Sequence, residues 1–170
     1  MKDLITAALD GVKLKILVFG PQVHTPSGEE RVAKLQAKRI QIREHLEADG
    51  HMVAYAEDLV DPSIGVPGGD AFFQELVIMR EYDMIVNIVD QPGSIVEATM
   101  IAMKTHLAAK AMLFQDAAYA GGLVAQACRT AKDLGAHVQQ FQYPQDLDEC
   151  HLLGHVADRV RLVQKMKYLA

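Results

Sequence analysis

The sequence contains no tryptophan, and only two of its 170 residues are cysteines. Cys128 and Cys150 show no CxxC spacing and no partner histidine motif, so we expect two reduced, partly buried thiols rather than a disulfide or a metal site. No apolar run approaches the roughly 18 residues that cross a membrane, and the first residues lack the core and cleavage site of a signal peptide. These absences predict a soluble, cytoplasmic protein with no membrane partner.

Several motifs that would identify a chemistry are also missing. The net charge of −5 provides no basic surface for nucleic acid, which disfavours a polynucleotide partner but is compatible with a small ligand. There is no G-x-G-x-x-G or Walker A pattern for a dinucleotide or a P-loop, and no G-x-S-x-G elbow. His151 and His155 lie four residues apart, but no H-E-x-x-H pattern and no third ligand accompany them. We therefore expect neither a metal nor a resident cofactor.

What the chain does have is a regular alternation of apolar runs and helical patterns. Half of its residues are hydrophobic, and the length suits one domain spanning 1–170, with a lead-in segment at 1–12 and a C-terminal helical segment at 145–169. Turn residues mark loops at 61–63 and 67–69. The predicted strands are 15–19, 51–56, 83–89, 111–114 and 137–143, and the predicted helices are 27–49, 70–81, 94–107, 123–134 and 147–169.

This alternation predicts an α/β three-layer sandwich with a five-stranded parallel sheet, because strands that alternate with helices form βαβ units. The flavodoxin-like order 2-1-3-4-5 fits five strands best. In that order the sheet changes direction between strands 1 and 3, and ligands bind outside the carboxyl ends of strands at such a point. The ends of these two strands are Gly20-Pro21 and Asp90-Gln-Pro-Gly93. The sequence therefore predicts one site made from these two loops.

Two acidic residues follow the third predicted strand. Glu97 lies in the first turn of the next helix, where the helix dipole favours an ionised carboxylate that can attack or stabilise an electrophilic sugar carbon. Alternatively, Ser94-Ile-Val-Glu97 is a capping box in which Glu97 only bonds the Ser94 amide. Asp90 either binds a hydroxyl and shares acid/base work or is a turn residue that bonds its own backbone. Two carboxylates at one site are what glycosidic-bond chemistry requires.

Other residues could complete the same site. Glu75 lies on the helix before strand 3, and Glu57-Asp58 follow strand 2; each is either a crevice residue or a solvated charge. Gly20-Pro21 permits close approach of a ligand or simply ends the strand. The polar loop that starts at Gln22 could close over a ligand. Ser27-Gly-Glu-Glu30 reads as the capping box of the first long helix.

The segments Lys15-Ile-Leu-Val-Phe-Gly-Pro21, Asp83 to Asp90, Pro92-Gly-Ser-Ile-Val-Glu97 and Lys110-Ala-Met-Leu-Phe resemble, in order, the signatures of the nucleoside 2-deoxyribosyltransferase-like family. The resemblance implies a flavodoxin-like fold and cleavage or exchange of the N-glycosidic bond of nucleosides. It assigns the nucleophile to Glu97, the acidic turn residue to Asp90 and the acidic residue of the preceding helix to Glu75. Gly93 and Ser94 would shape the pocket floor. Similar arrangements also resemble TIR-like domains of bacterial defence effectors, which act on NAD or bind nucleotide signals.

Three functional hypotheses follow. The first is an enzyme that cleaves or transfers the N-glycosidic bond of a nucleoside, nucleotide or NAD-like substrate, with Glu97, Asp90 and Glu75 as catalytic residues and Gly20, Pro21, Gln22, Gly93 and Ser94 as substrate-binding residues. The second is a non-catalytic nucleotide-binding sensor or effector module that uses the same crevice. The third is a scaffold that works through oligomerisation, because the apolar stripe of the last helix could pack on a partner; a homo-oligomer is expected.

Overall fold

The computed structural model describes residues 1–64 and 70–170. Its centre is a five-stranded, all-parallel sheet in the order β2-β1-β3-β4-β5, so the predicted fold class and strand order are confirmed. The strands are β1 (Lys15–Phe19), β2 (Met52–Tyr55), β3 (Met84–Val89), β4 (Ala111–Asp116) and β5 (His137–Phe141). Strands β3 and β4 are buried along their whole length, as expected for parallel strands that are covered on both faces.

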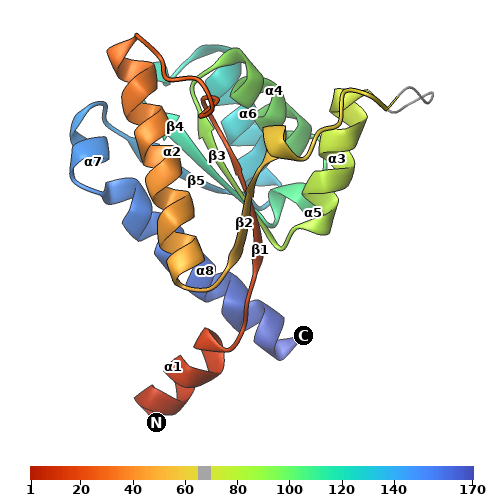
Figure 1. The fold of residues 1–170 in the computed structure, drawn as a ribbon, viewed down its shortest axis with the longest axis vertical. Helices are drawn as coiled ribbons and strands as arrows, with labels where there is room; N and C mark the ends of the chain where they lie inside the picture. Colours follow the sequence, from red (N-terminus) through yellow and green to blue (C-terminus); the bar gives the residue numbers. More distant parts are fainter. Residues whose placement is uncertain (65–69) are drawn as a thin grey trace.

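The two faces of the sheet are covered by different sets of helices (Figure 1). One face packs against α2 (Glu30–Ala48), α7 (Gln145–Asp148) and α8 (His151–Leu169). The other packs against α3 (Ala71–Glu81), α4 (Pro92–Ala102), α5 (Thr105–Ala108) and α6 (Gly122–Asp133). Because side chains alternate along a strand, Val86 and Ile88 of β3 face α2 and α8, while Ile85 and Val89 face α4.

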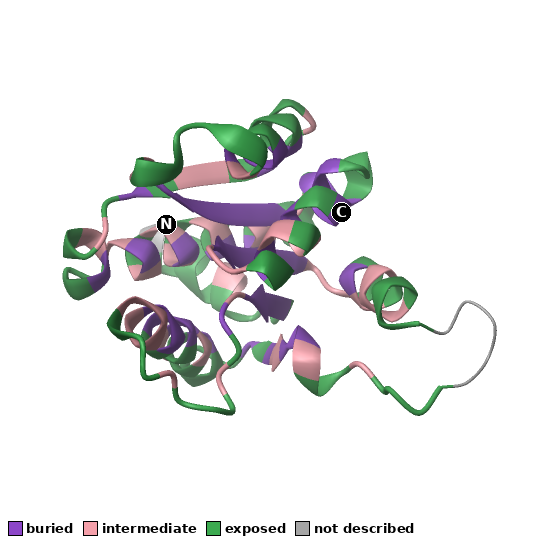
Figure 2. Cartoon of the chain, turned by 90° about the horizontal axis from the view of Figure 1, so that it is seen from above, coloured by how far each residue is buried: buried purple, intermediate pink, exposed green. Residues whose placement is uncertain are grey.

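Burial follows this layering (Figure 2). Buried residues concentrate on the strands and on the inner sides of the helices, and exposed residues cover the outer sides. Short 3-10 turns, η1 (Ala56–Asp58) and η2 (Ala117–Tyr119), follow β2 and β4. The lead-in segment forms helix α1 (Lys2–Asp10), which packs beside α8 so that both chain ends lie at the same end of the molecule (Figure 1).

Several predicted boundaries are wrong. The predicted helix 94–107 is two helices, because the extended backbone of Lys104 separates α4 from α5. The predicted helix 147–169 is interrupted at Cys150, whose left-handed backbone (φ 57°) separates α7 from α8. Strand β4 continues to Asp116, past the predicted end at 114, and β5 stops at Phe141, before the predicted end at 143. The predicted loop at 67–69 lies outside the described residues.

The predicted capping box at Ser27 does not form. Helix α2 begins at Glu30 with Glu29 as its N-cap, and no side chain caps it. Ser27 instead lies in the preceding loop, where its amide donates to Gln36 Oε1 (3.0 Å) and its Oγ accepts from the Glu29 amide (3.1 Å). Gln36 also donates to the carbonyls of Gln22 and Thr25. One side chain of α2 thus ties loop 22–27 down onto the helix, which the S-x-x-E spacing does not reveal.

Candidate active site at the ends of β1 and β3

The chain leaves β1 and β3 toward opposite faces of the sheet, since α2 follows β1 on one face and α4 follows β3 on the other. The predicted switch point is therefore where the sequence placed it. Gly20 ends β1 with a φ of +146°, which L side chains rarely adopt. A Cβ at Gly20 would lie 3.4 Å from Arg39 Cδ and 3.4 Å from Ile88 Cβ. Glycine here lets the side chain of Arg39 pass across the end of the strand.

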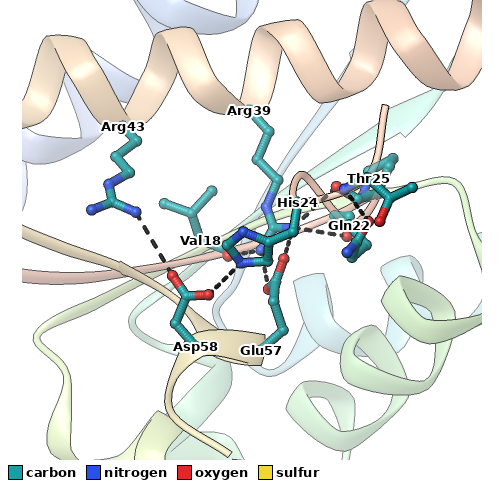
Figure 3. A network of polar contacts seen from close by, with 10 residues as sticks. Val18, Gln22, His24, Thr25, Arg39, Arg43, Glu57 and Asp58 are labelled. Carbon is teal, nitrogen blue, oxygen red and sulfur yellow. Dashed lines mark hydrogen bonds and ion pairs between the residues drawn. The ribbon is translucent and has the colours of Figure 1, made fainter. Parts of the chain in front are cut away.

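Arg39 is fully buried, and it ties the carboxyl ends of β1 and β2 together (Figure 3). Its guanidinium donates to the carbonyls of Val18 (2.5 Å), Gly20 (3.2 Å) and Pro21 (3.0 Å). It also makes a bidentate ion pair with Glu57, with both N···O distances at 2.6 Å. Such paired contacts to one carboxylate fix its orientation. Glu57 is therefore a fixed carboxylate at this edge of the sheet, with only 29% of its side chain exposed.

A second set of charges surrounds this ion pair (Figure 3). His24 Nε2 lies 2.5 Å from Asp58 Oδ1, and Arg43 Nη1 lies 3.8 Å from Asp58 Oδ2. The guanidinium groups of Arg39 and Arg43 lie 4.5 and 4.7 Å from the Tyr55 ring centroid, which adds cation–π attraction. Polar contacts thus join loop 22–27 and turn η1 at this edge of the sheet.

Glu97 lies in the second turn of α4, and its Oε2 is buried with no hydrogen-bond partner among the described residues. Burial first, and then the charges of Glu75 and Glu57 against the opposing charge of Arg39, together raise the pKa of Glu97 from 4.5 to about 8. A carboxyl group that is neutral at pH 7 and lacks an internal partner is unusual for a structural residue and typical of functional sites.

The alternative interpretation of Glu97 as a helix cap is wrong. Helix α4 begins at Pro92 with Gln91 as its N-cap, so Ser94 is the third residue of the helix. Ser94 Oγ accepts from the amides of Asp90 and Gln91, both at 3.0 Å, and donates to the Gln91 carbonyl. Gln91 and Ser94 therefore form the capping box of α4 between them, and Glu97 has no part in it.

Glu75 of α3 joins Glu97 and Glu57 at this edge. Burial and the charge of Glu57 raise the pKa of Glu75. The structure therefore brings together the predicted Glu97 and Glu75 with Glu57, which the sequence offered as a crevice residue but did not single out. Arg39, their shared cation, was missed, because nothing in the sequence distinguishes it from the other basic residues of α2.

Asp90 belongs to a different cluster, in which Arg31 of α2 holds its carboxylate. Its Oδ1 accepts from Arg31 Nη2 (2.5 Å) and Nε (2.9 Å), and the same Nη2 donates to Asp116 Oδ2 (2.7 Å). The Arg31 guanidinium also lies 4.6 Å from the Tyr143 ring centroid and 5.4 Å from that of Tyr119. The strand alternation that puts Ile88 toward α2 also puts Asp90 there. Its carboxylate is thus held by α2 and is not among the charges that shift Glu97.

The predicted binding residues have mixed positions. Pro21 is buried and accepts from Arg39, whereas Gln22 is exposed, with its Oε1 accepting from the Thr25 amide (3.1 Å). Gly93 is exposed in the first turn of α4, and a Cβ there would lie 4.0 Å from Glu97 Oε1. Ser94 is buried as the cap of α4. Gly20, Pro21 and Gly93 therefore lie at the ends of β1 and β3 beside Arg39 or Glu97, and Ser94 belongs to the cap of α4.

Comparisons with known proteins give no information about the function. A scan against protein-family models finds no match for the chain, and a search of curated proteins finds no relative. Among the described helices, none is long and apolar enough to span a bilayer.

The two cysteines differ from the expectation that both are partly buried. Cys128 is buried and Cys150 is exposed.

Proposed function

We propose that the crevice at the ends of β1 and β3 binds a nucleoside, nucleotide or NAD-like molecule and that the protein cleaves or transfers its N-glycosidic bond, with Glu97 as nucleophile. One observation carries the proposal: the Glu97 carboxyl group is buried at the switch point of the sheet, its Oε2 has no partner among the described residues, and two further carboxyl groups raise its pKa. Ligands of open α/β sheets bind at this point.

The proposed reaction uses two of these carboxyl groups. Ionised Glu97 attacks the anomeric carbon and forms an ester, while the C–N bond breaks and its electron pair leaves with the base. Glu75, whose pKa is raised by burial and by Glu57, donates a proton to the departing nitrogen. Water or a second base then attacks the same carbon, the C–O bond to Glu97 breaks, and the proton of the incoming group passes to Glu75. Two inversions retain the anomeric configuration.

A sugar also suits the unpaired acceptors on this side of the sheet. Asn87 Nδ2 donates to the Ser94 carbonyl (2.9 Å), but Asn87 Oδ1 is buried and, like Glu97 Oε2, has no partner among the described residues. Buried acceptors without partners cost about 1–3 kcal/mol each. A ligand hydroxyl group can donate to Asn87 Oδ1, and it can donate to or accept from the Glu97 carboxyl group, depending on whether that group is ionised.

The second candidate function is a non-catalytic nucleotide-binding module that uses the same crevice. Two observations favour it. A pKa of about 8 leaves only about a tenth of Glu97 ionised at pH 7, so most molecules present a neutral acid that can hydrogen-bond a base but cannot attack a sugar. Asp90, the other expected catalytic carboxylate, is occupied by Arg31.

Base release distinguishes the two functions. We expect the wild-type protein to release free base from nucleosides, nucleotides or NAD, with kcat/KM rising as the pH approaches 8 because ionised Glu97 accumulates. Glu97→Gln should lower the rate at least about a hundredfold, while Glu44→Gln, an exposed position on α2, should not change it. Equal rates for wild type and Glu97→Gln would contradict the nucleophile. A ligand-induced rise in Tm without base release would favour the binding module.

We also propose a cytoplasmic homo-oligomer. Support comes from exposed apolar side chains on α1 and the end of α8, here called the terminal apolar surface: Leu4, Ile5, Met166, Tyr168 and Leu169. Leu4 and Leu169 are 72% and 73% exposed, and a groove of about 470 Å³ runs between the two helices. Contiguous apolar surface of this kind favours association. The scaffold hypothesis requires the same surface but no crevice chemistry.

A further inference from the structure

Helix α8 presents two histidines one turn apart, away from the carboxylate crevice. His151 Nε2 and His155 Nε2 lie 3.1 Å apart and share a hydrogen bond that a bound metal would replace, and the two ring planes meet at 77° with their centroids separated by 4.4 Å. The helix that carries them is well anchored, since Leu152, Val156 and Val160 on its inner side are buried in the core. Both imidazoles are half-buried, so packing limits their motion while one edge stays accessible to solvent.

The separation of the two nitrogens matches what a single metal ion requires. A metal bound by two imidazoles at about 2.05 Å from each, with its ligand nitrogens as far apart as these are, has an N–metal–N angle of about 100°, between the octahedral and tetrahedral values. The other i, i+4 pair on a helix surface, His45 Nε2 and Asp49 Oδ2, is 3.8 Å apart and would force an angle of about 135°. Of these two pairs, the α8 pair has the spacing of a chelate.

We propose that His151 and His155 form a two-ligand site for a divalent transition metal, with water in the remaining coordination positions. This site is independent of the proposed N-glycosidic function. Within residues 1–64 and 70–170, no group of three or more histidine, cysteine or acidic side chains is placed to hold a metal, so the coordination stays open. An open site of this kind exchanges metal or accepts a further ligand from solution.

The chemistry of the surroundings selects the metal. Two neutral imidazoles suit Ni²⁺, Cu²⁺ and Zn²⁺, whereas Mg²⁺ and Ca²⁺ require oxygen ligands. Charged groups of both signs lie near the pair: Arg159 is one turn further along α8 and Asp158 precedes it, while His137 of β5 is on the same side of the sheet as Met112, facing α8. Coordination by the ring nitrogens therefore provides the proposed binding.

Calorimetric titration of the full, tag-free chain with nickel chloride at pH 7.5 tests the proposal. We expect one Ni²⁺ per chain, and at least about tenfold weaker binding for His151→Gln and for His155→Gln, because loss of even a supporting partner of a ligand has that effect. The matched control His45→Gln, on the pair with the wrong spacing, should bind like wild type. Circular dichroism checks that each variant is folded.

The exposed thiol of Cys150, next to His151, is the competing nickel ligand. Cys150→Ser should therefore keep the nickel affinity of wild type if the histidine pair is the site. The proposal is overturned if Cys150→Ser abolishes binding, if His45→Gln weakens it as much as His151→Gln, or if the wild-type protein binds no more nickel than the double variant His151→Gln/His155→Gln.

Discussion

Replacing Glu97 with glutamine should stabilise the protein increasingly as the pH rises. The reason is that folding places this carboxyl group where its charged form is disfavoured, by burial first and by Glu75 and Glu57 next. Glutamine keeps the shape of the protonated acid and cannot ionise. The substitution therefore removes the cost of keeping a carboxyl group protonated while leaving the packing of α4 in place. Enzymes often gain stability in this way when a functional group is removed.

The sign and size of the effect follow from the two pKa values. Below pH 4.5 Glu97 is protonated in both the folded and the unfolded chain, so it costs nothing. Above pH 4.5 the unfolded chain ionises first, and the free energy of unfolding falls by about 1.4 kcal/mol per pH unit until the folded-state pKa of about 8. The loss is about 3 kcal/mol between pH 5 and 7. It levels off above pH 8, where both states are ionised.

Urea unfolding followed by far-UV circular dichroism measures this difference, since the chain has no tryptophan to report unfolding by fluorescence. Wild type and Glu97→Gln are compared at pH 5, 6, 7 and 8, at one protein concentration so that any association contributes equally. The stability advantage of the variant should grow by about 3 kcal/mol from pH 5 to 7. Glu44→Gln, at an exposed position, should give a flat difference. A flat difference for Glu97→Gln as well would refute the raised pKa.

Two further predictions test the ion pair and the assembly. Arg39→Met should lower the free energy of unfolding by about 3–5 kcal/mol, because it leaves Glu57 without its buried partner; Arg43→Met, whose ion pairs are more exposed, should cost about 1 kcal/mol or less. If urea unfolding shows the same loss in free energy of unfolding for both variants, the burial of Arg39 does not strengthen its ion pair. Light scattering should give an oligomer for wild type and a smaller species for Leu4→Glu, while Leu123→Glu, an equally exposed position on α6, should leave the mass unchanged. A monomeric wild type would exclude assembly through the terminal apolar surface.

Much of the candidate site could be predicted because its position depends on the fold alone. The apolar runs at 15–19 and 83–89 are long enough to be read as buried strands, and Gly20 and Pro92-Gly93 mark where each ends. Glu97 was found for the same reason, since its place near the start of the helix that follows β3 can be predicted from local sequence. The capping boxes were misread because S-x-x-E spacing also occurs where the helix starts elsewhere, as at Glu30 and Pro92.

The side of the sheet on which Asp90 lies could have been predicted from the sequence. Its place two residues after Ile88 puts it on the α2 side of the sheet, while Glu97 lies on α4 on the opposite side. The period of two along the strand therefore argued against a joint role for these carboxylates. The partner that holds Asp90 could not be found in this way, since Arg31 is 59 residues distant in the chain and one of several basic residues on α2.

The sequence by itself determined the layers, the strand order and the edge of the sheet where a ligand would bind, because these depend on apolar periodicity and on chain connections that are local or follow general rules. Only the tertiary structure decided which charges meet there. Arg39 and Arg43 lie one turn apart on the same helix, yet one is fully buried against Glu57 and the other is partly exposed. Burial and charge pairing depend on distances between residues far apart in the chain. These distances place Glu97 near Glu75 and Glu57, so that it is mostly neutral at pH 7, and they pair Asp90 with Arg31.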